Sequence, residues 1–284
     1  MAEAETSTEP MQDTPPIWPG WLVATAICIR FYSRLPVPRL PGEGDLHGIP
    51  DFRLVPRALP FAALAIALPA ALVTLFGGLV GLSGMVVAAL ALTALALSTG
   101  ALHEDGLADS ADGLFGGRDR ERRLEIMKDS RIGSYGAMTL GLSLLLRASL
   151  IAGILEHAGA WGAAAALLVA APWSRAEGLL LLATQPAARS GGASAAVGQP
   201  SLATARIALA LSLVAATGIA LAAHLPLAGL LVGFALAHGA AAVSARLARR
   251  LIGGQTGDIV GAVQQLAEIA IYLGLALALG WAGR

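Results

Sequence analysis

Long apolar stretches alternate with short polar connections over most of the 284 residues of this chain. A helix needs about 20 consecutive apolar residues to cross the hydrocarbon core of a bilayer, and seven of the stretches are near this length. They run approximately over 59–81, 84–102, 135–155, 161–183, 207–223, 227–245 and 265–283. The pattern predicts an all-α fold, a polytopic integral membrane helical bundle with about seven transmembrane helices.

The composition supports a membrane protein. Hydrophobic residues make up 56% and charged residues 13% of the chain, and the mean hydropathy is +0.70. These values lie far from those of a soluble domain. Residues 1–16 are rich in Glu, Thr, Ser and Pro, and we expect a disordered tail there, before a single membrane-embedded catalytic domain over 17–284. The apolar segment 17–32 is shorter and contains Pro19, so three placements stay open for it: a span, a re-entrant segment or an interfacial helix.

Basic residues concentrate in alternate connections of the predicted bundle. Nearly all arginines lie in 30–57, 118–131, 189–206 and 246–250. The intervening connections, near Ser83, His157 and His224, contain none. Because Lys and Arg accumulate in cytoplasmic loops, this parity predicts that the polar connections face the cytoplasm. The formal net charge of +0 argues against nucleic-acid binding, and the single cysteine excludes an intramolecular disulfide.

A polar island over 103–113 interrupts this apolar sequence and is the strongest candidate for chemistry. If the preceding helix continues through it, Asp105, Asp109 and Asp112 are spaced i, i+4 and i+7 and share one face. Carboxylates on one stripe repel each other, and a bound cation relieves this repulsion. Oxygen ligands suit Mg²⁺, which commonly completes its shell with water and substrate phosphates. The island therefore predicts a magnesium site for a phosphorylated substrate; the alternative is a solvated acidic helix cap.

The segment 118–131 mixes both charges with apolar residues one helical turn apart, which is typical of a helix lying at the membrane interface. Its last residues include Lys128, Asp129 and Arg131. Cationic side chains here are suited to contact phosphate oxygens opposite the carboxylates. We interpret these three residues as substrate-binding, whereas the arginine-rich beginning of the segment fits a role in topology or lipid headgroup contact.

A glycine-rich turn over 253–258 precedes the last helix and offers backbone N–H groups to an anion. It ends in Asp258, which we interpret as a second acidic contact for phosphate or metal. Glu268 lies about three turns further on and is predicted to reach into the bundle.

Three ionisable residues fall inside predicted spans and should face the bundle interior. Arg175 follows Pro172, and we interpret it as a substrate contact. For Arg147 a structural ion pair with Glu177 is at least as plausible as a functional role. The role of His103 stays open.

The motifs resemble those of the cobalamin (5'-phosphate) synthase family, also named adenosylcobinamide-GDP ribazoletransferases. The run over 102–136 carries most of the resemblance, with His103, Asp105-Gly106, Ala108-Asp109, Ala111-Asp112-Gly113, Gly116-Gly117, Glu125 through Gly133, and Gly136. Shorter agreements lie at 31–38, 173–175 and 253–258. Glu104 departs from the pattern, in which a leucine commonly follows the histidine.

The resemblance implies the last assembly step of cobalamin biosynthesis, at the bacterial inner membrane with the active site facing the cytoplasm. Adenosylcobinamide-GDP would transfer its adenosylcobinamide phosphoryl group to α-ribazole or α-ribazole 5'-phosphate, giving adenosylcobalamin or its 5'-phosphate and releasing GMP. Such an enzyme would be a Mg²⁺-dependent phosphotransferase acting on a nucleotide-activated substrate. The expected catalytic and metal residues are Asp105, Asp109 and Asp112. The expected substrate-binding residues are Lys128, Asp129, Arg131, Arg175, Asp258 and Glu268.

Two other classes are weighed against this interpretation. A CDP-alcohol phosphotransferase also holds metal with Asp residues at helix ends, but its Asp-Gly-x-x-Ala-Arg signature is absent from this sequence. A membrane transporter could use Arg147, Arg175 and Glu177 along a pathway. Such a protein should show internal pseudo-symmetry and polar residues near the midplane of several spans, whereas this chain concentrates its polarity at one face.

Overall fold

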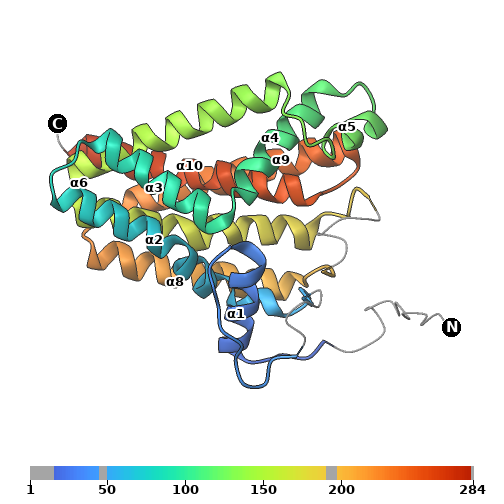
Figure 1. The fold of residues 1–284 in the computed structure, drawn as a ribbon, viewed down its shortest axis with the longest axis horizontal. Helices are drawn as coiled ribbons and strands as arrows, with labels where there is room; N and C mark the ends of the chain where they lie inside the picture. Colours follow the sequence, from blue (N-terminus) through green and yellow to red (C-terminus); the bar gives the residue numbers. More distant parts are fainter. Residues whose placement is uncertain (1–15, 45–49, 190–196, 283–284) are drawn as a thin grey trace.

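The computed structural model describes residues 16–44, 50–189 and 197–282. Over these ranges the regular secondary structure is helical, apart from one isolated β-bridge between Ala187 and Gln255. All but the last residue of the predicted tail lies outside the described residues. Figure 1 shows the arrangement. The helices are α1 (Trp21–Tyr32), η1 (Val55–Ala58), α2 (Leu59–Leu79), α3 (Gly84–Thr99), α4 (Leu102–Gly116), α5 (Arg120–Ile126), α6 (Ser134–Thr184), α8 (Leu202–Ala222), α9 (Leu227–Ile252) and α10 (Gly257–Ala282).

The described helices confirm an all-α membrane bundle. Five are long and apolar enough to cross a bilayer, or six if α3 and α4 count as one broken span. One of the five, α6, has 51 residues, about 77 Å of helix against an apolar layer of about 30 Å. It is kinked at Gly159, whose φ is 71°, and in Figure 1 the chain turns back there. Its first arm (134–158) and second arm (160–184) match two of the predicted spans.

The helix before the polar island ends there, and a separate helix, α4, contains Asp105, Asp109 and Asp112, so their i, i+4 and i+7 spacing on a helix is kept. Between α3 and α4 the axis bends by 90°. Two successive residues cause the break, because Gly100 and Ala101 have φ angles of 65° and 57°, in the left-handed region that ends a helix. The N–H of Arg34 then donates to the carbonyl of Ser98 at 2.7 Å, satisfying a group that the ended helix leaves free.

Within the undecided segment 17–32, residues 21–32 form the 12-residue helix α1, which is about 18 Å long and too short for a span. Figure 1 shows it standing across the direction of the long helices. It packs on η1, on the connection before η1 and on the start of α2, through buried side chains that include Cys28, Phe52 and Leu59. This contact carries the end of α1 to the bend between α3 and α4.

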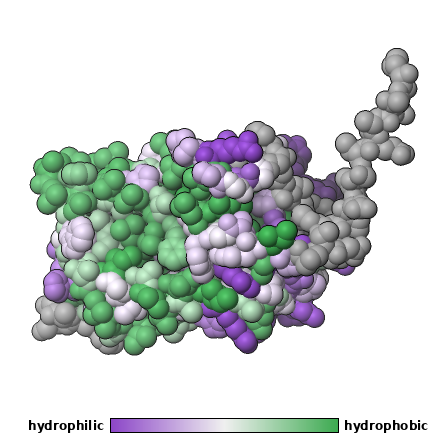
Figure 2. Space-filling model, turned by 90° about the horizontal axis from the view of Figure 1, so that it is seen from below, coloured by the Kyte–Doolittle hydropathy of each residue, from purple (hydrophilic) through white to green (hydrophobic). Residues whose placement is uncertain are grey.

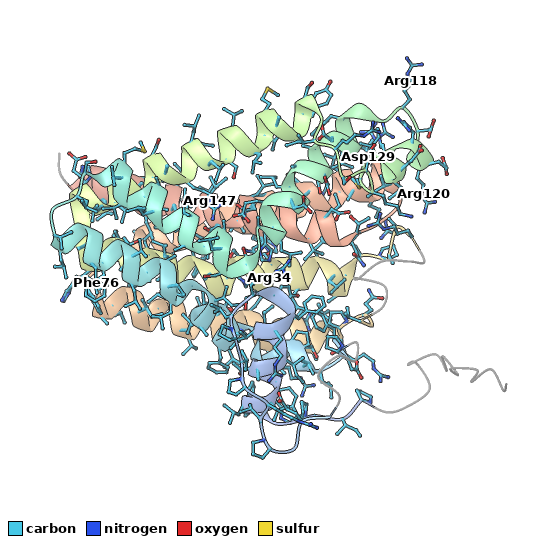
Figure 3. All side chains as sticks on the ribbon, in the orientation of Figure 1. Arg34, Phe76, Arg118, Arg120, Asp129 and Arg147 are labelled. Atoms are coloured by element: carbon cyan, nitrogen blue, oxygen red, sulfur yellow. The ribbon has the colours of Figure 1, made fainter. Side chains whose placement is uncertain are left out.

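Polar and apolar residues separate along the bundle. Figure 2 shows an apolar surface over one end and most of the middle, with hydrophilic residues gathered toward the other end. Phe76 lies at the apolar end, whereas Arg118, Arg120 and Asp129 lie at the opposite end, which we call the polar end (Figure 3). Large apolar side chains such as Leu97 are exposed around the bundle, at 73% for that residue. An apolar belt of this kind fits a lipid-facing surface.

Candidate functional site

Helix α4 packs closely against the first turns of α10 in the half of the bundle nearer the polar end. At the crossing, a Cβ added to Gly106 would lie 2.9 Å from the carbonyl oxygen of Asp258, closer than real Cβ atoms come. A Cβ on Gly261 would meet the backbone of His103 at 3.4 Å. Glycine on both helices therefore permits this approach, which brings the polar island beside the glycine-rich turn.

Three carboxylates gather at this crossing, and we call Asp105, Asp109 and Asp258 the carboxylate cluster. The negative charges of Asp105 and Asp258 both act on Asp109, as does that of Asp112. Asp258 has partial compensation, since it accepts from Arg189 Nη2 at 3.3 Å and from Thr256. Within the described residues, the carboxylates of Asp105 and Asp109 have neither a hydrogen-bond nor an ion-pair partner. The predicted juxtaposition of Asp258 with the island is thus present.

Asp112, the third member of the predicted stripe, is turned toward the start of α6. Its two oxygens accept the N–H groups of Gly133 and Gly136, at 2.7 and 2.8 Å. These are orphan donors at a helix N-terminus, where a carboxylate also interacts favourably with the helix dipole. Both glycines approach the carboxylate so closely that a Cβ would collide with it. Asp112 therefore caps α6, although each of its oxygens keeps a further lone pair.

Over the described ranges, no group of three His, Cys, Asp or Glu side chains is arranged to hold one metal ion. The predicted stripe of Asp105, Asp109 and Asp112 extends over about 10 Å of helix, and its last member is occupied as a cap. The metal site stays a prediction.

The predicted phosphate contacts before α6 lie apart from the cluster. Asp129 accepts the backbone N–H and the guanidinium of Arg131, with the shortest distance 2.6 Å. Hydrogen bonds from Arg131 lower the pKa of Asp129 to about 2. The Arg131 side chain is 87% exposed, and Lys128 is exposed as well. This pair neutralises itself at the polar end, and no described contact joins these residues to the carboxylate cluster.

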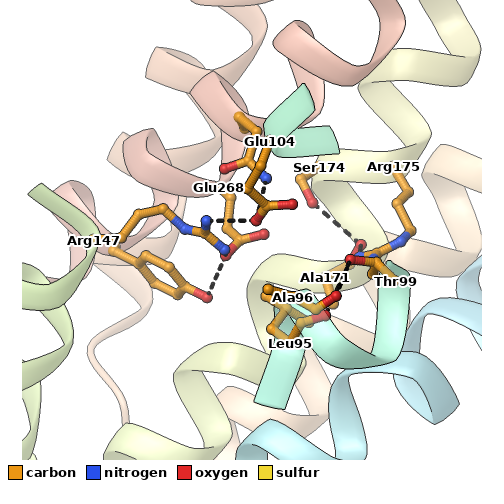
Figure 4. Close-up of polar contacts among 11 residues, drawn as sticks. Leu95, Ala96, Thr99, Glu104, Arg147, Ala171, Ser174, Arg175 and Glu268 are labelled. Atoms are coloured by element: carbon orange, nitrogen blue, oxygen red, sulfur yellow. Dashed lines mark hydrogen bonds and ion pairs between the residues drawn. The ribbon is translucent and has the colours of Figure 1, made fainter. Parts of the chain in front are cut away.

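Arg147 lies fully buried in the middle of the bundle and joins two carboxylates (Figures 3 and 4). It donates through Nη1 to Glu104 at 2.9 Å and through Nη2 to Glu268 at 2.8 Å. Gln265 donates to Glu104 at 2.9 Å, and the Tyr272 hydroxyl donates to Glu268 at 3.0 Å. We call these five residues the buried ion network. It fastens α4, α6 and α10 together, and Glu268 reaches into the bundle as predicted.

The predicted ion pair between Arg147 and Glu177 is wrong. Glu177 instead lies 3.3 Å from His238 on α9, while Glu104 and Glu268 occupy both arms of the Arg147 guanidinium. The reason is the bend before α4, which turns the polar island into the bundle and sets Glu104 beside the first arm of α6. An apolar sequence pattern contains no signal for this bend beyond Gly100.

Arg175 is buried and only partly bonded. It is 3% exposed, and its Nη1 donates to the carbonyl of Ala171 at 3.2 Å, while Nε and Nη2 have no partner in the described chain. The Nε2 atom of buried His103 is likewise unpartnered, and its ring stacks on Tyr32 with centroids 6.2 Å apart. Glu268 and Glu104 act electrostatically on Arg175. Unsatisfied buried donors of this kind call for water or a polar ligand.

The sequence interpretation missed three partners. Glu104 was only noted as a departure, although an arginine inside the bundle calls for carboxylates to neutralise it. Gln265, Glu268 and Tyr272 are spaced i, i+3 and i+7, so they share one face of the helix. This spacing indicates a polar face directed into the bundle. Arg189, which pairs with Asp258, lies in a separate connection, and the sequence offers no sign of that contact.

The fold and the site define a polytopic membrane protein whose acidic residues meet where two helices cross near its polar end. The cobalamin-5-phosphate synthase family matches this chain over residues 24–276, and the chain belongs to that family.

Several relatives are named adenosylcobinamide-GDP ribazoletransferase. The protein of Azorhizobium caulinodans is 48% identical over 258 residues, which cover 89% of this chain and 95% of the relative. That of Sinorhizobium sp. is 47% identical over 251 residues, 88% and 94% of the two chains. That of Rhizobium meliloti is 42% identical over 269 residues, 95% of this chain and 100% of the relative. No solved structure matches the chain significantly.

Proposed function

We propose that this protein is an adenosylcobinamide-GDP ribazoletransferase that depends on Mg²⁺. It transfers the adenosylcobinamide phosphoryl group to α-ribazole or α-ribazole 5'-phosphate and releases GMP. Family membership and the names of the relatives support the reaction. The observation that carries the site is the carboxylate cluster, because Asp105 and Asp109 lack partners in the described chain while neighbouring negative charges repel them.

The donor set of the cluster fits magnesium. Carboxylate oxygens are hard ligands, and Mg²⁺ commonly takes only one or two of them, with water and substrate phosphates completing the shell. Since no three carboxylates of the described residues are arranged around one ion, Asp109 with one neighbour, Asp105 or Asp258, would hold it. Asp112 remains a candidate through its free lone pairs. When bound, the ion would neutralise the diphosphate oxygens and the charge that develops on the departing GMP.

The side chains of this protein supply the remaining steps. The ribose 3'-hydroxyl of α-ribazole attacks the phosphorus linked to cobinamide, and the bond from that phosphorus to the GMP oxygen breaks. One carboxylate of the cluster accepts the hydroxyl proton. We expect Arg175 and Arg189 to contact the polar parts of the substrate, which is supported by the two unbonded nitrogens of Arg175 and by the position of Arg189 beside Asp258. Lys128 and Arg131 are better suited to the first encounter, since both are exposed at the polar end.

We infer that the polar end faces the cytoplasm. The alternation of arginine-rich and arginine-free connections supports this orientation by the positive-inside rule. A soluble nucleotide-activated substrate then reaches the carboxylate cluster without crossing the membrane.

The proposal is tested by GMP release from the purified protein in nanodiscs, given adenosylcobinamide-GDP and α-ribazole with and without Mg²⁺. We expect Mg²⁺-dependent GMP and cobalamin formation, abolished by Asp109→Asn. Glu121→Gln is the matched control, an exposed carboxylate at the polar end that keeps activity. Folded protein that releases no GMP with any divalent metal would contradict the proposal and favour the transporter, which releases no nucleotide.

A further inference from the structure

A cavity of about 330 Å³ lies between the second arm of α6 and helix α9. Most of its wall is apolar, formed by Leu180 and Leu181 on one helix and by alanines such as Ala241 and Ala242 on the other. None of the residues that line it belongs to the carboxylate cluster or to the buried ion network. It is therefore a separate site within the described residues, open between two helices that face lipid.

Two arginines stand on the rim of this cavity. Arg246 and Arg249 line it from the last turns of α9, and both are exposed. They are three residues apart, so they lie on the same face of the helix. Neither side chain has a hydrogen-bond or ion-pair partner among the described residues. The rim thus carries two uncompensated positive charges next to an apolar trough, at the end of a membrane helix.

The interior of the cavity is unfavourable for an anionic group, because a carboxylate forms part of its wall. Glu177, 1% exposed and paired with His238, contributes a carboxylate to the wall. An anionic group is therefore held at the arginine rim, with an apolar body lying along the leucines and alanines. At the edge of the cavity, Gln185 has a buried side-chain oxygen with no partner in the described chain. Such an oxygen is suited to accept a hydrogen bond from a hydroxyl group.

We propose that this cavity seats an anionic phospholipid with a hydroxylated headgroup, of the phosphatidylglycerol class. Its phosphate contacts Arg246 and Arg249, its headgroup hydroxyl donates to Gln185, and one acyl chain lies in the trough between α6 and α9. Basic pockets between membrane helices are known to select anionic headgroups in this way. The lipid would join the polar-end halves of two helices that line a gap in the bundle.

The test is a titration of phosphatidylglycerol into phosphatidylcholine nanodiscs holding the full-length protein, with bound lipid counted by native mass spectrometry. We expect one retained phosphatidylglycerol and a dissociation constant about fivefold weaker for Arg246→Gln or Arg249→Gln, the effect of removing one basic residue near a headgroup. Arg250→Gln is the matched control, the next residue on α9 and not part of the cavity wall. It should leave binding unchanged.

A second variant tests the trough and keeps both arginines. Ala242→Leu fills apolar space, and we expect it to weaken lipid retention while leaving the carboxylate cluster intact. The proposal is overturned if Arg249→Gln and Arg250→Gln bind phosphatidylglycerol equally. The proposal is also overturned if soluble glycerol phosphate or GMP, measured in the same way, binds the protein as tightly as the lipid does, since the rim would then be a small-anion site.

Discussion

Two neighbouring residues of α4, Glu104 and Asp105, belong to groups that differ in how their carboxylates are satisfied. Glu104 sits in the buried ion network, where Arg147 and Gln265 both donate to it. Asp105 is exposed in the carboxylate cluster, and within the described chain it has no partner and repels Asp109 and Asp258. A rotation of about 100° per residue separates the two environments. A carboxylate whose oxygens already accept hydrogen bonds from neighbouring side chains holds helices together, whereas one without such partners is free to bind a ligand.

Removing a carboxylate from the cluster should give the largest effect on activity and none on folding. Asp109→Asn is expected to lower GMP release at least about a thousandfold, because a metal contact is worth several kcal/mol of barrier. The thermal midpoint should stay or rise, since the variant relieves repulsion by three neighbours. Activity assays beside thermal unfolding in detergent check this. A large fall in the thermal midpoint would show that the carboxylate cluster, like the buried ion network, stabilises the fold.

Breaking the buried ion network should do the reverse and mainly reduce stability. Arg147→Met leaves Glu104 and Glu268 buried without their cation, which is expected to lower the free energy of unfolding by about 3–5 kcal/mol. Adding Glu104→Gln and Glu268→Gln to this variant removes both charges and should recover much of the loss. Reversible unfolding in mixed micelles measures both. No recovery in the triple variant would show that the network is not held by charge balance.

Asp112 is intermediate between the two groups in how far its carboxylate is satisfied, because each of its oxygens accepts one hydrogen bond and keeps a further lone pair. Asp112→Asn weakens the bonds to Gly133 and Gly136 and should destabilise the protein by about 1–2 kcal/mol. Hydrogen exchange should rise at the first turn of α6. If the residue only caps that helix, Mg²⁺ affinity measured by calorimetry should remain close to that of the unchanged protein. If Asp112→Asn weakens Mg²⁺ binding as much as Asp109→Asn does in the same calorimetric measurement, Asp112 is a metal ligand as well.

The smallest effect concerns a saturated carboxylate outside the spanning helices. Arg30 donates to both oxygens of Glu43, at 2.7 and 3.1 Å, and lowers the pKa of that carboxyl. A lowered pKa stabilises the fold above the unfolded value of about 4.3, and this contribution is lost as the pH falls through the folded value. Glu43→Gln should therefore lower the melting temperature by about 2 °C at pH 7 and by less at pH 3. An equal shift at both pH values would exclude the ion pair as its cause.

Much of the architecture follows from the sequence because a bilayer tolerates few solutions. Apolar runs of spanning length predict helices, and the alternation of arginine-rich and arginine-free connections predicts which helix ends lie on the same side of the membrane. The acidic residues of the polar island could also be singled out from the sequence, since charged residues are rare in such a chain. Asp258 and the island both flank apolar spans at the same end, and the structure brings Asp258 close enough for its charge to act on Asp109.

The remaining features depend on local backbone geometry that a hydropathy pattern does not contain. The bend after Thr99 needs a positive φ at Ala101 as well as at Gly100, and few alanines adopt that conformation, so Gly100 alone was not enough to predict the bend. That bend decides that Arg147 pairs with Glu104 and not with Glu177. It also explains why Asp112 faces the start of α6, a contact between residues more than 20 positions apart.

The glycine contact between α4 and α10 bears on how such a protein can change over generations. On the belt around the bundle, one apolar side chain can replace another, because hydrocarbon chains adjust to either shape. At Gly106 the addition of a single methyl group meets the backbone beside Asp258, and a whole helix must move to admit it. Inherited variation should therefore accumulate around residues such as Leu97 long before it reaches this crossing, and a saturation library should lose nearly every substitution at Gly106.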